Sequence, residues 1–341
     1  MSHDFAHIPV IDVAPLVAAT QPNAAPAVAA QAAVAREIDR ACRQSGFFYV
    51  VGHGVDPALQ RRLHHAAREF FAQPVDVKHR IAMSRGGKAW RGYFRVGDEL
   101  TSGKPDQKEG LYFGAELAPD DPAVRSGTPL HGPNLFPEQP PELRAAVLEY
   151  MAALTKLGHR FLAGIALALG LDEQYFADHG TREPLTLFRI FNYPAPRRET
   201  SDLWGVGEHT DYGLLTILLQ DDAGGLEVKS GDRWVAAPPL ENSYVCNIGD
   251  MLDRMTRGVY RSTPHRVRNA AARDRLSFPF FFDPNFFAPV RPIDLPSGET
   301  APDDRASRWD ATSVHVFEGT YGDYLLGKVG KVFPELKSQV L

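Results

Sequence analysis

Beyond Pro184 the chain consists of short apolar segments that are rich in β-branched and aromatic residues. Gly, Pro, Asn and Asp residues separate these segments, which is the pattern of strands bounded by turns. Many short strands at close spacing are typical of a β-sandwich or barrel. We therefore predict a mainly β core over residues 184–290. The segments are LTLFRIFNYPAP, GLLTILLQ, GLEVKSGDRWVAAPP, SYVCNIGD, HRVRN and RLSFPFFF.

The chain before this core mixes helical and strand-like segments. Helices are expected from apolar residues at helical spacing and from terminal signals such as Asp56 before Pro57. The expected helices cover 23–44, 56–74 and 140–171, and the expected strands cover 7–16, 46–55, 90–96 and 108–115. We expect a mixed α/β chain that forms one compact unit. Its parts are an N-terminal α/β region at 1–125, a helical segment at 126–183, the core, and a C-terminal extension with a helix at 291–341.

Composition excludes several classes of protein. The net charge of −5 provides no basic footprint for nucleic acid, and no basic run suggests a membrane surface. Two distant cysteines, Cys42 and Cys246, support neither a disulfide framework nor a thiolate zinc cluster. The first residues show no signal-peptide pattern. We therefore expect a cytoplasmic protein, a monomer or weak homo-oligomer, that acts on a small molecule and binds neither nucleic acid nor membranes.

One group of residues has the spacing of a metal site. His209 and Asp211 stand two positions apart at the start of an apolar run, and side chains at this spacing on a strand share one face. His265 follows far downstream, and the strands expected in between can bring it beside His209 and Asp211. Two imidazoles and one carboxylate on one face of an octahedron leave three positions open, which is the facial triad suited to Fe(II). We predict that these three residues bind Fe(II).

An arginine and a serine form a second group. Arg275 and Ser277 also stand two positions apart in a strand-like segment, whereas Asp274 would point to the opposite face. An inward guanidinium in an apolar strand needs an anion, and it can hold a carboxylate through two parallel hydrogen bonds. A dicarboxylate that spans from the metal to Arg275 would satisfy both ends. 2-Oxoglutarate has this shape.

With these motifs the sequence resembles the isopenicillin N synthase-like family of Fe(II)- and 2-oxoglutarate-dependent oxygenases. The resemblance rests on HTDYGLLTILLQDD, NIGDML, STPHRV and RLS in the core, and on IPVIDVAPL, SGFFYVVGHGV and RGYF near the start. It implies a double-stranded β-helix, or jelly roll, around the iron, with O₂ as the oxidant. It also implies that Tyr193 reaches the far carboxylate of 2-oxoglutarate with Arg275 and Ser277. Many plant members carry an Asn two positions before this Tyr, where this chain has Phe191, with Asn192 adjacent.

The same resemblance indicates where substrate binds. The matching positions are around Arg91 and Tyr93, at Trp204 just before the metal motif, and in the segment from Phe280 to Phe282, with Phe280 and Phe282 as the candidates. An aromatic pocket with one arginine would suit a small, partly apolar molecule that bears a carboxylate. Alternatively, these aromatic residues fill the interior of the jelly roll.

Four functions remain open at this point. The leading one is oxidation of a small organic molecule by hydroxylation, desaturation or cyclisation, with release of succinate and CO₂. An ethylene-forming or isopenicillin N synthase-like oxidase is the second. A zinc hydrolase could use the same His-Asp-His set but would not need Arg275 and Ser277. A catalytically silent binding protein or sensor is the fourth.

Overall fold

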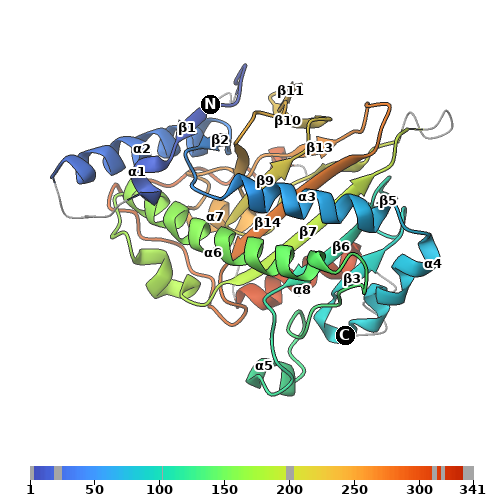
Figure 1. Cartoon of the computed structure of the whole chain (residues 1–341). Coiled ribbons are helices and arrows are strands. Elements are labelled where there is room, and N and C mark those ends of the chain that lie inside the picture. The colour runs from blue at the N-terminus through green and yellow to red at the C-terminus, as the bar shows by residue number, and fades with distance from the viewer. Residues whose placement is uncertain are drawn as a thin grey trace.

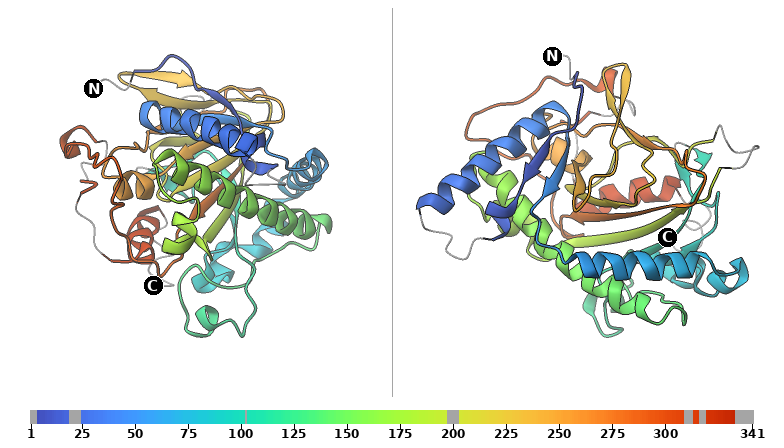
Figure 2. Two further views of the ribbon diagram at one scale, coloured as in Figure 1. Left: turned by 90° about the vertical axis from the view of Figure 1, so that its left-hand side faces the viewer. Right: turned by 45° about the horizontal axis from the view of Figure 1, so that its top comes forward.

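The computed structural model describes residues 4–18, 25–101, 103–196, 203–308, 313–315 and 319–332. Its centre is an eight-stranded sheet with the strand order β1-β2-β12-β9-β14-β7-β6-β3, opposed by a four-stranded sheet with the order β11-β10-β13-β8. The ribbon shows long helices on the outer side of the large sheet and the small sheet on its other side (Figures 1 and 2). A separate pair, β4 and β5, completes the sheets of the described residues.

The strands are β1 (Val10–Asp12), β2 (Phe47–Val51), β3 (Gly92–Phe94), β4 (Leu100–Thr101), β5 (Lys104–Pro105), β6 (Glu109–Gly114), β7 (Leu185–Tyr193), β8 (Val206–His209), β9 (Leu215–Gln220), β10 (Leu226–Ser230), β11 (Arg233–Ala236), β12 (Tyr244–Ile248), β13 (His265–Val267) and β14 (Arg275–Asp283). The α-helices are α1 (Ala14–Val17), α2 (Ala25–Gln44), α3 (Pro57–Phe71), α4 (Val75–Lys78), α5 (Pro122–Arg125), α6 (Glu142–Ala168), α7 (Asp250–Met255) and α8 (Tyr321–Val332).

The middle of the large sheet is formed by β14, which pairs antiparallel with β7 on one side and β9 on the other. Side chains along β14 alternate between the two faces of the sheet. Phe282 points outward to α6, where a Cβ on Gly158 would lie only 2.3 Å from the phenylalanine ring. Glycine at this position therefore lets α6 approach the sheet closely.

The helices that cover the sheet have the ends that the sequence predicts. Asp56 caps α3 by accepting a hydrogen bond from the Ala58 amide, and Pro57 occupies the first turn. The long helix α6 stops just before Gly170, whose φ of +74° is a left-handed conformation that glycine adopts without strain. Both expected helices are thus confirmed to within a few residues.

The N-terminal region is part of the same sheet as the core. β2 pairs with β12 at one side of the sheet, and β6 pairs with β7 at the other. The division into four regions stays a prediction, but these pairings are what one compact unit requires. Cys42 and Cys246 are both buried and free. Among the described residues, no helix is long and apolar enough to cross a membrane, and the cytoplasmic location stays a prediction.

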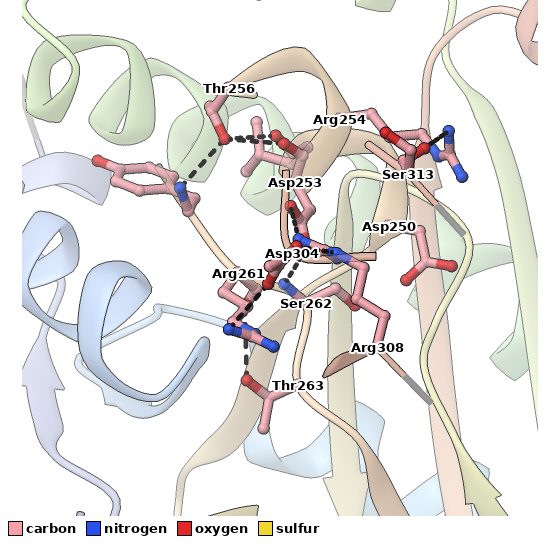
Figure 3. A network of polar contacts seen from close by, with 12 residues as sticks. Asp250, Asp253, Arg254, Thr256, Arg261, Ser262, Thr263, Asp304, Arg308 and Ser313 are labelled. Carbon is pink, nitrogen blue, oxygen red and sulfur yellow. Dashed lines mark hydrogen bonds and ion pairs between the residues drawn. The ribbon is translucent and has the colours of Figure 1, made fainter. Parts of the chain in front are cut away.

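The C-terminal extension is fixed to the core by a buried ionic network (Figure 3). Arg308 makes two hydrogen bonds to Asp253 of α7, at 2.8 and 3.1 Å, and the Asp253 side chain is 0% exposed. Asp304 joins the network through Arg308 and through Arg261, at 3.1 Å. Arg254 adds a hydrogen bond of 3.0 Å to the Ser313 carbonyl. The segment after the jelly roll is therefore held by charge pairs as well as by apolar contacts.

Removing Arg308 should destabilise the protein strongly. In Arg308→Met the buried Asp253 carboxylate loses its ion-pair partner, which typically costs about 3–5 kcal/mol. The free energy of unfolding in urea measures this loss. Arg233→Met is the matched control, because Arg233 pairs with Asp4 on the surface, and such pairs contribute about 0–1 kcal/mol. Equal losses in the two variants would contradict a structural role for the network.

Candidate active site

A cavity of about 200 Å³ is lined by residues of both sheets. The small sheet contributes His209 and His265, and the large sheet contributes Asn247 and Arg275. Leu325 of α8 also belongs to its wall. The cavity therefore brings together the two groups of residues that the sequence singles out, the metal-ligand set and the arginine of β14.

The structure brings His209, Asp211 and His265 together at one end of this cavity. The Nε2 atoms of His209 and His265 lie 4.0 and 3.8 Å from Asp211 Oδ1, so one ion could contact all three. The two histidines are direct partners across β8 and β13. The prediction that His209 and Asp211 share a strand is wrong, because β8 ends at His209 and Asp211 lies in the loop that follows.

Backbone carbonyls orient both imidazoles. His209 Nδ1 lies 2.8 Å from the Gly207 carbonyl oxygen, and His265 Nδ1 lies 3.3 Å from that of Thr263. A carbonyl can only accept, so each Nδ1 carries the proton and each Nε2 keeps its lone pair for a metal. Both rings are thus prepared for coordination by hydrogen bonds to residues two positions earlier.

Two residues that the sequence analysis did not single out hold the carboxylate. Asp211 Oδ2 accepts hydrogen bonds from the Thr216 hydroxyl at 2.6 Å and from Asn247 Nδ2 at 2.7 Å. Thr216 and Asn247 are direct partners across β9 and β12, so neighbouring strands present both donors side by side. Oδ1 remains for a metal. The only sequence signal for Asn247 is its place in NIGDML, one of the segments that carries the family resemblance.

The charge states suit a divalent cation. Burial lowers the pKa of His265 to about 4 and also lowers that of His209, so both imidazoles are neutral at pH 7. Burial opposes ionisation of Asp211, but the adjacent imidazoles and the hydrogen bonds from Asn247 and Thr216 leave its pKa below the usual value. Two neutral imidazoles and one carboxylate are the donor set of a non-haem Fe(II) site.

Arg275 lies fully buried on β14 with one N–H group that has no partner. Its Nε donates to the Gly224 carbonyl and its Nη2 lies 3.3 Å from Gln220 Oε1, whereas Nη1 makes no hydrogen bond. A buried, unpaired guanidinium N–H is costly unless a ligand accepts from it. Ser277 and Tyr193 line the same cavity, and the Tyr193 ring lies 4.7 Å from the Arg275 guanidinium carbon. These residues fit a carboxylate ligand.

Asn192 cannot replace the asparagine that is expected at Phe191. Successive side chains of β7 alternate between its faces, and Phe191 and Tyr193 line the cavity. Asn192 points the other way and donates to Glu109 Oε1 at 2.9 Å. Asp274 likewise avoids Arg275, because it accepts from the Ala195 amide at 2.8 Å.

The candidate substrate residues Arg91 and Tyr93 lie outside the cavity wall, so their prediction is wrong. Arg91 donates to three backbone carbonyls, those of Ala115, Leu130 and Gly132. Tyr93 donates to Glu109 Oε2 and packs against Phe70 of α3, on the side of the sheet that faces the helices. Both side chains therefore support the fold and do not contact the cavity.

Trp204, Phe280 and Phe282 are also displaced from the cavity. Trp204 contacts the Arg266 guanidinium, at 4.1 Å from the ring centre, and is not part of the cavity wall. On β14 the positions that share a face with Arg275 and Ser277 are odd-numbered, so Phe281 lines the cavity. Phe280 and Phe282 are fully buried and take the opposite face. The two-residue period of a strand predicts this difference between odd- and even-numbered positions of β14.

Charged and aromatic residues of the N-terminal strands and of β7 line the cavity instead. Tyr112 of β6 and Arg189 of β7 are direct cross-strand partners, and Glu99 and Lys108 are their neighbours in the cavity wall. Asp283, at the end of β14, also reaches the cavity, and burial raises its pKa to about 7. None of these residues was among the candidates from sequence, because each lies in a segment that reads only as a strand or its adjoining loop.

Alanine substitutions at Phe281 and Phe282 should separate the two faces of β14. Phe282→Ala removes a fully buried ring against α6 and should cost about 3–5 kcal/mol of unfolding free energy. Phe281→Ala should cost clearly less and should change which small molecules the protein binds. Urea unfolding and ligand titration measure the two effects. A larger loss of stability in Phe281→Ala would mean that the assignment of faces is wrong.

Comparison with known proteins places both parts of the chain in one enzyme group. Residues 8–139 match the family described as non-haem dioxygenase in morphine synthesis N-terminal, and residues 186–284 match the 2OG-Fe(II) oxygenase superfamily. A probable iron/ascorbate oxidoreductase of Dictyostelium discoideum is 50% identical over 330 residues, covering 90% of this chain and 91% of the relative. A homoarginine-6-hydroxylase of Arabidopsis thaliana is 36% identical, covering 96% and 98%.

A 1-aminocyclopropane-1-carboxylate oxidase of Dictyostelium mucoroides is 37% identical, covering 89% of this chain and 90% of the relative. Among solved structures, Neurospora crassa T7H in complex with alpha-KG and thymine has a TM-score of 0.77 at 26% identity, covering 97% of this chain and 99% of that chain. These similarities confirm the predicted jelly roll, iron and 2-oxoglutarate. The chain therefore belongs to the 2OG-Fe(II) oxygenase superfamily and is an Fe(II)- and 2-oxoglutarate-dependent oxygenase related to isopenicillin N synthase.

Proposed function

We propose that His209, Asp211 and His265 are the iron ligands of this oxygenase and that it hydroxylates a small organic molecule. The histidines would bind through Nε2 and the aspartate through Oδ1, the three atoms that the surrounding hydrogen bonds leave available. All three line the cavity, so a substrate in the cavity would stand beside the metal. Hydroxylation is supported by the relatives that are named homoarginine-6-hydroxylase.

We further propose that Arg275, Ser277 and Tyr193 bind the distal carboxylate of 2-oxoglutarate. The observation that carries this proposal is the partnerless Nη1 of Arg275, a fully buried donor in the same cavity as the His-Asp-His set. A guanidinium and a hydroxyl are a strong combination for a carboxylate. A zinc hydrolase would leave this donor without a function.

The residues around the site would perform two tasks in support of the metal and the cosubstrate. When bound, Fe(II) and 2-oxoglutarate supply the O₂-dependent oxidation, and the cosubstrate leaves as succinate and CO₂. Thr216 and Asn247 would keep Asp211 ionised and oriented throughout. Apolar cavity residues such as Leu187, Phe191 and Leu218 would exclude water from the reacting atoms.

Arg275→Met should raise the requirement for 2-oxoglutarate. Loss of hydrogen bonds to a charged group costs about 1.5–3 kcal/mol, so the half-saturating concentration of 2-oxoglutarate should rise about 10- to 100-fold. Anaerobic titration followed by the visible band of the Fe(II)–2-oxoglutarate chelate measures this change. Arg182→Met on the surface is the control. An unchanged titration in Arg275→Met would show that the cosubstrate binds elsewhere.

His265→Ala should abolish binding of Fe(II) and all turnover. Removing one of three ligands leaves an incomplete facial set, and the neighbouring Asp211 cannot replace an imidazole. Metal content after anaerobic reconstitution and dialysis measures the loss. His7→Ala is the control, because that side chain is exposed and belongs to neither group of possible metal ligands among the described residues. Full iron occupancy in His265→Ala would disprove the assignment of ligands.

Product analysis separates hydroxylation from an ethylene-forming reaction. The second reaction stays an alternative because of the relatives that are named 1-aminocyclopropane-1-carboxylate oxidase. A hydroxylase forms one succinate for each hydroxylated product, and no ethylene appears in the gas phase. Ethylene in the headspace would replace hydroxylation by the alternative, without affecting the metal assignment.

A further inference from the structure

The cavity contains a second arginine that the cosubstrate does not explain. Arg189 lies on β7 with its guanidinium carbon 3.5 Å from the ring centre of Tyr112. Its Nη1 donates to the carbonyls of Phe113 and Phe188, at 3.1 and 3.2 Å. Within the described part of the chain, no carboxylate forms an ion pair with Arg189. Glu99 and Asp283 act on Arg189 only at longer range, so this buried cation has no carboxylate in direct contact, and a buried charge is stable when an anion balances it.

The anion at Arg189 would be a different one from the cosubstrate. Arg275 pairs with Tyr193, which lies four residues beyond Arg189 along β7. Four residues of strand span roughly 13 Å. Arg275 and Arg189 thus occupy separate levels of the same cavity wall, and a single carboxylate cannot bind both. Arg189 is available to the substrate.

Two carboxylates near Arg189 share one ammonium group. Lys108 contacts Glu99 Oε2 at 2.9 Å and Asp106 Oδ2 at 2.5 Å, so one ammonium serves two carboxylates. Burial, together with the like charge of Glu99, raises the pKa of Asp106 despite the lysine. Glu99 belongs to the cavity wall. A cationic group of a ligand at Glu99 would balance the second carboxylate.

Tyr112 connects the two charges. Its hydroxyl donates to Glu99 Oε1 at 2.6 Å, and its ring faces the Arg189 guanidinium. A positive and a negative group thus stand one tyrosine side chain apart on the same cavity wall. This is the arrangement that would bind a carboxylate and an ammonium group carried by one small molecule.

We propose that the substrate is a free amino acid whose carboxylate binds Arg189 and whose ammonium group binds Glu99, with Tyr112 positioning both residues. This inference rests on the proposed function, because it names the substrate class for the same cavity. Leu130, Leu187 and Phe281 provide apolar wall for the aliphatic part of the side chain.

The first experiment uses the wild-type protein with Fe(II), 2-oxoglutarate and O₂, and measures succinate release. The amino acid probes are the twenty standard amino acids, L-homoarginine and 1-aminocyclopropane-1-carboxylate. The other probes are thymine and indole-3-acetate, which lack the zwitterionic head group. We expect at least one amino acid to stimulate succinate release and to appear as an oxidised product. The inference would be overturned if only thymine or indole-3-acetate stimulated succinate release, or if none of the probes did.

Analogues of the best amino acid then test each charge. One analogue lacks the carboxylate, and the other carries an acetyl group on the amine. Removing one charge-assisted contact should weaken binding about 10- to 100-fold for each analogue, measured by calorimetric titration of the anaerobic Fe(II)–2-oxoglutarate protein. Equal affinity for the parent amino acid and both analogues would show that neither Arg189 nor Glu99 reads the head group.

Variants assign each contact to its residue. Arg189→Met should bind the parent and the decarboxylated analogue within about threefold of each other, and Glu99→Gln should do the same for the parent and the N-acetyl analogue. Arg182→Met, an exposed arginine, should keep the wild-type ratios. A wild-type ratio in Arg189→Met would overturn its role.

The outcomes separate this inference from the proposed function. The chelate band requires Fe(II) and 2-oxoglutarate but no substrate, so its absence in the wild type would defeat the proposed function itself. A normal band without any response to amino acids would defeat only the substrate class. The chelate band also shows whether each variant is folded. For a variant without the band, the affinities of the wild type for the analogues test whether the head group is recognised.

Discussion

The Asp211 carboxylate links the two sheets at the metal end of the cavity. One oxygen accepts hydrogen bonds from Thr216 and Asn247, which belong to neighbouring strands of the large sheet. The other carboxylate oxygen faces His209 and His265, which lie on paired strands of the small sheet. The large sheet therefore helps to hold Asp211 in place beside the two histidines of the small sheet. A change in the packing of the two sheets would move Asp211 away from the two histidines, although all three side chains would still be present.

Two buried arginines in the rest of the cavity would bind two different anions. Arg275 has a donor without a partner, at the level of Tyr193. Arg189, four residues before Tyr193 on β7, contacts backbone carbonyls and an aromatic ring but forms no direct ion pair within the described chain. Burying guanidinium groups without anions is unfavourable, so both positions are better explained by ligands than by stability. The proposed iron ligands line the same cavity, so a cosubstrate at Arg275 and a substrate at Arg189 would both lie in the space that the metal would face.

The sequence singles out residues that the structure brings together at the proposed metal and cosubstrate positions, but most of the substrate candidates lie outside the cavity. His209, Asp211, His265 and Arg275 could be found because short spacings within strands and loops place them on one side, and because each is costly to bury without a partner. Phe280 and Phe282 are wrong as candidates because the two-residue period of β14, which places Arg275 and Ser277 on the cavity face, turns even-numbered positions to the opposite face. Arg91 is wrong as a candidate because its Nη1 and Nη2 donate to three carbonyls of the loop region between β6 and α6. No local pattern reveals such a loop.

The proposed head-group site is assembled from both halves of the chain. Glu99, Lys108 and Tyr112 lie within residues 8–139, the part that matches the N-terminal dioxygenase family, whereas Arg189 lies within the oxygenase core. The metal ligands and Arg275 all lie in the core. Because β6 pairs with β7, a substitution in the N-terminal region can change the charge beside Arg189 without displacing a metal ligand. Substrate preference could thus diverge among relatives while the core chemistry stayed the same, since the two depend on different segments of one sheet.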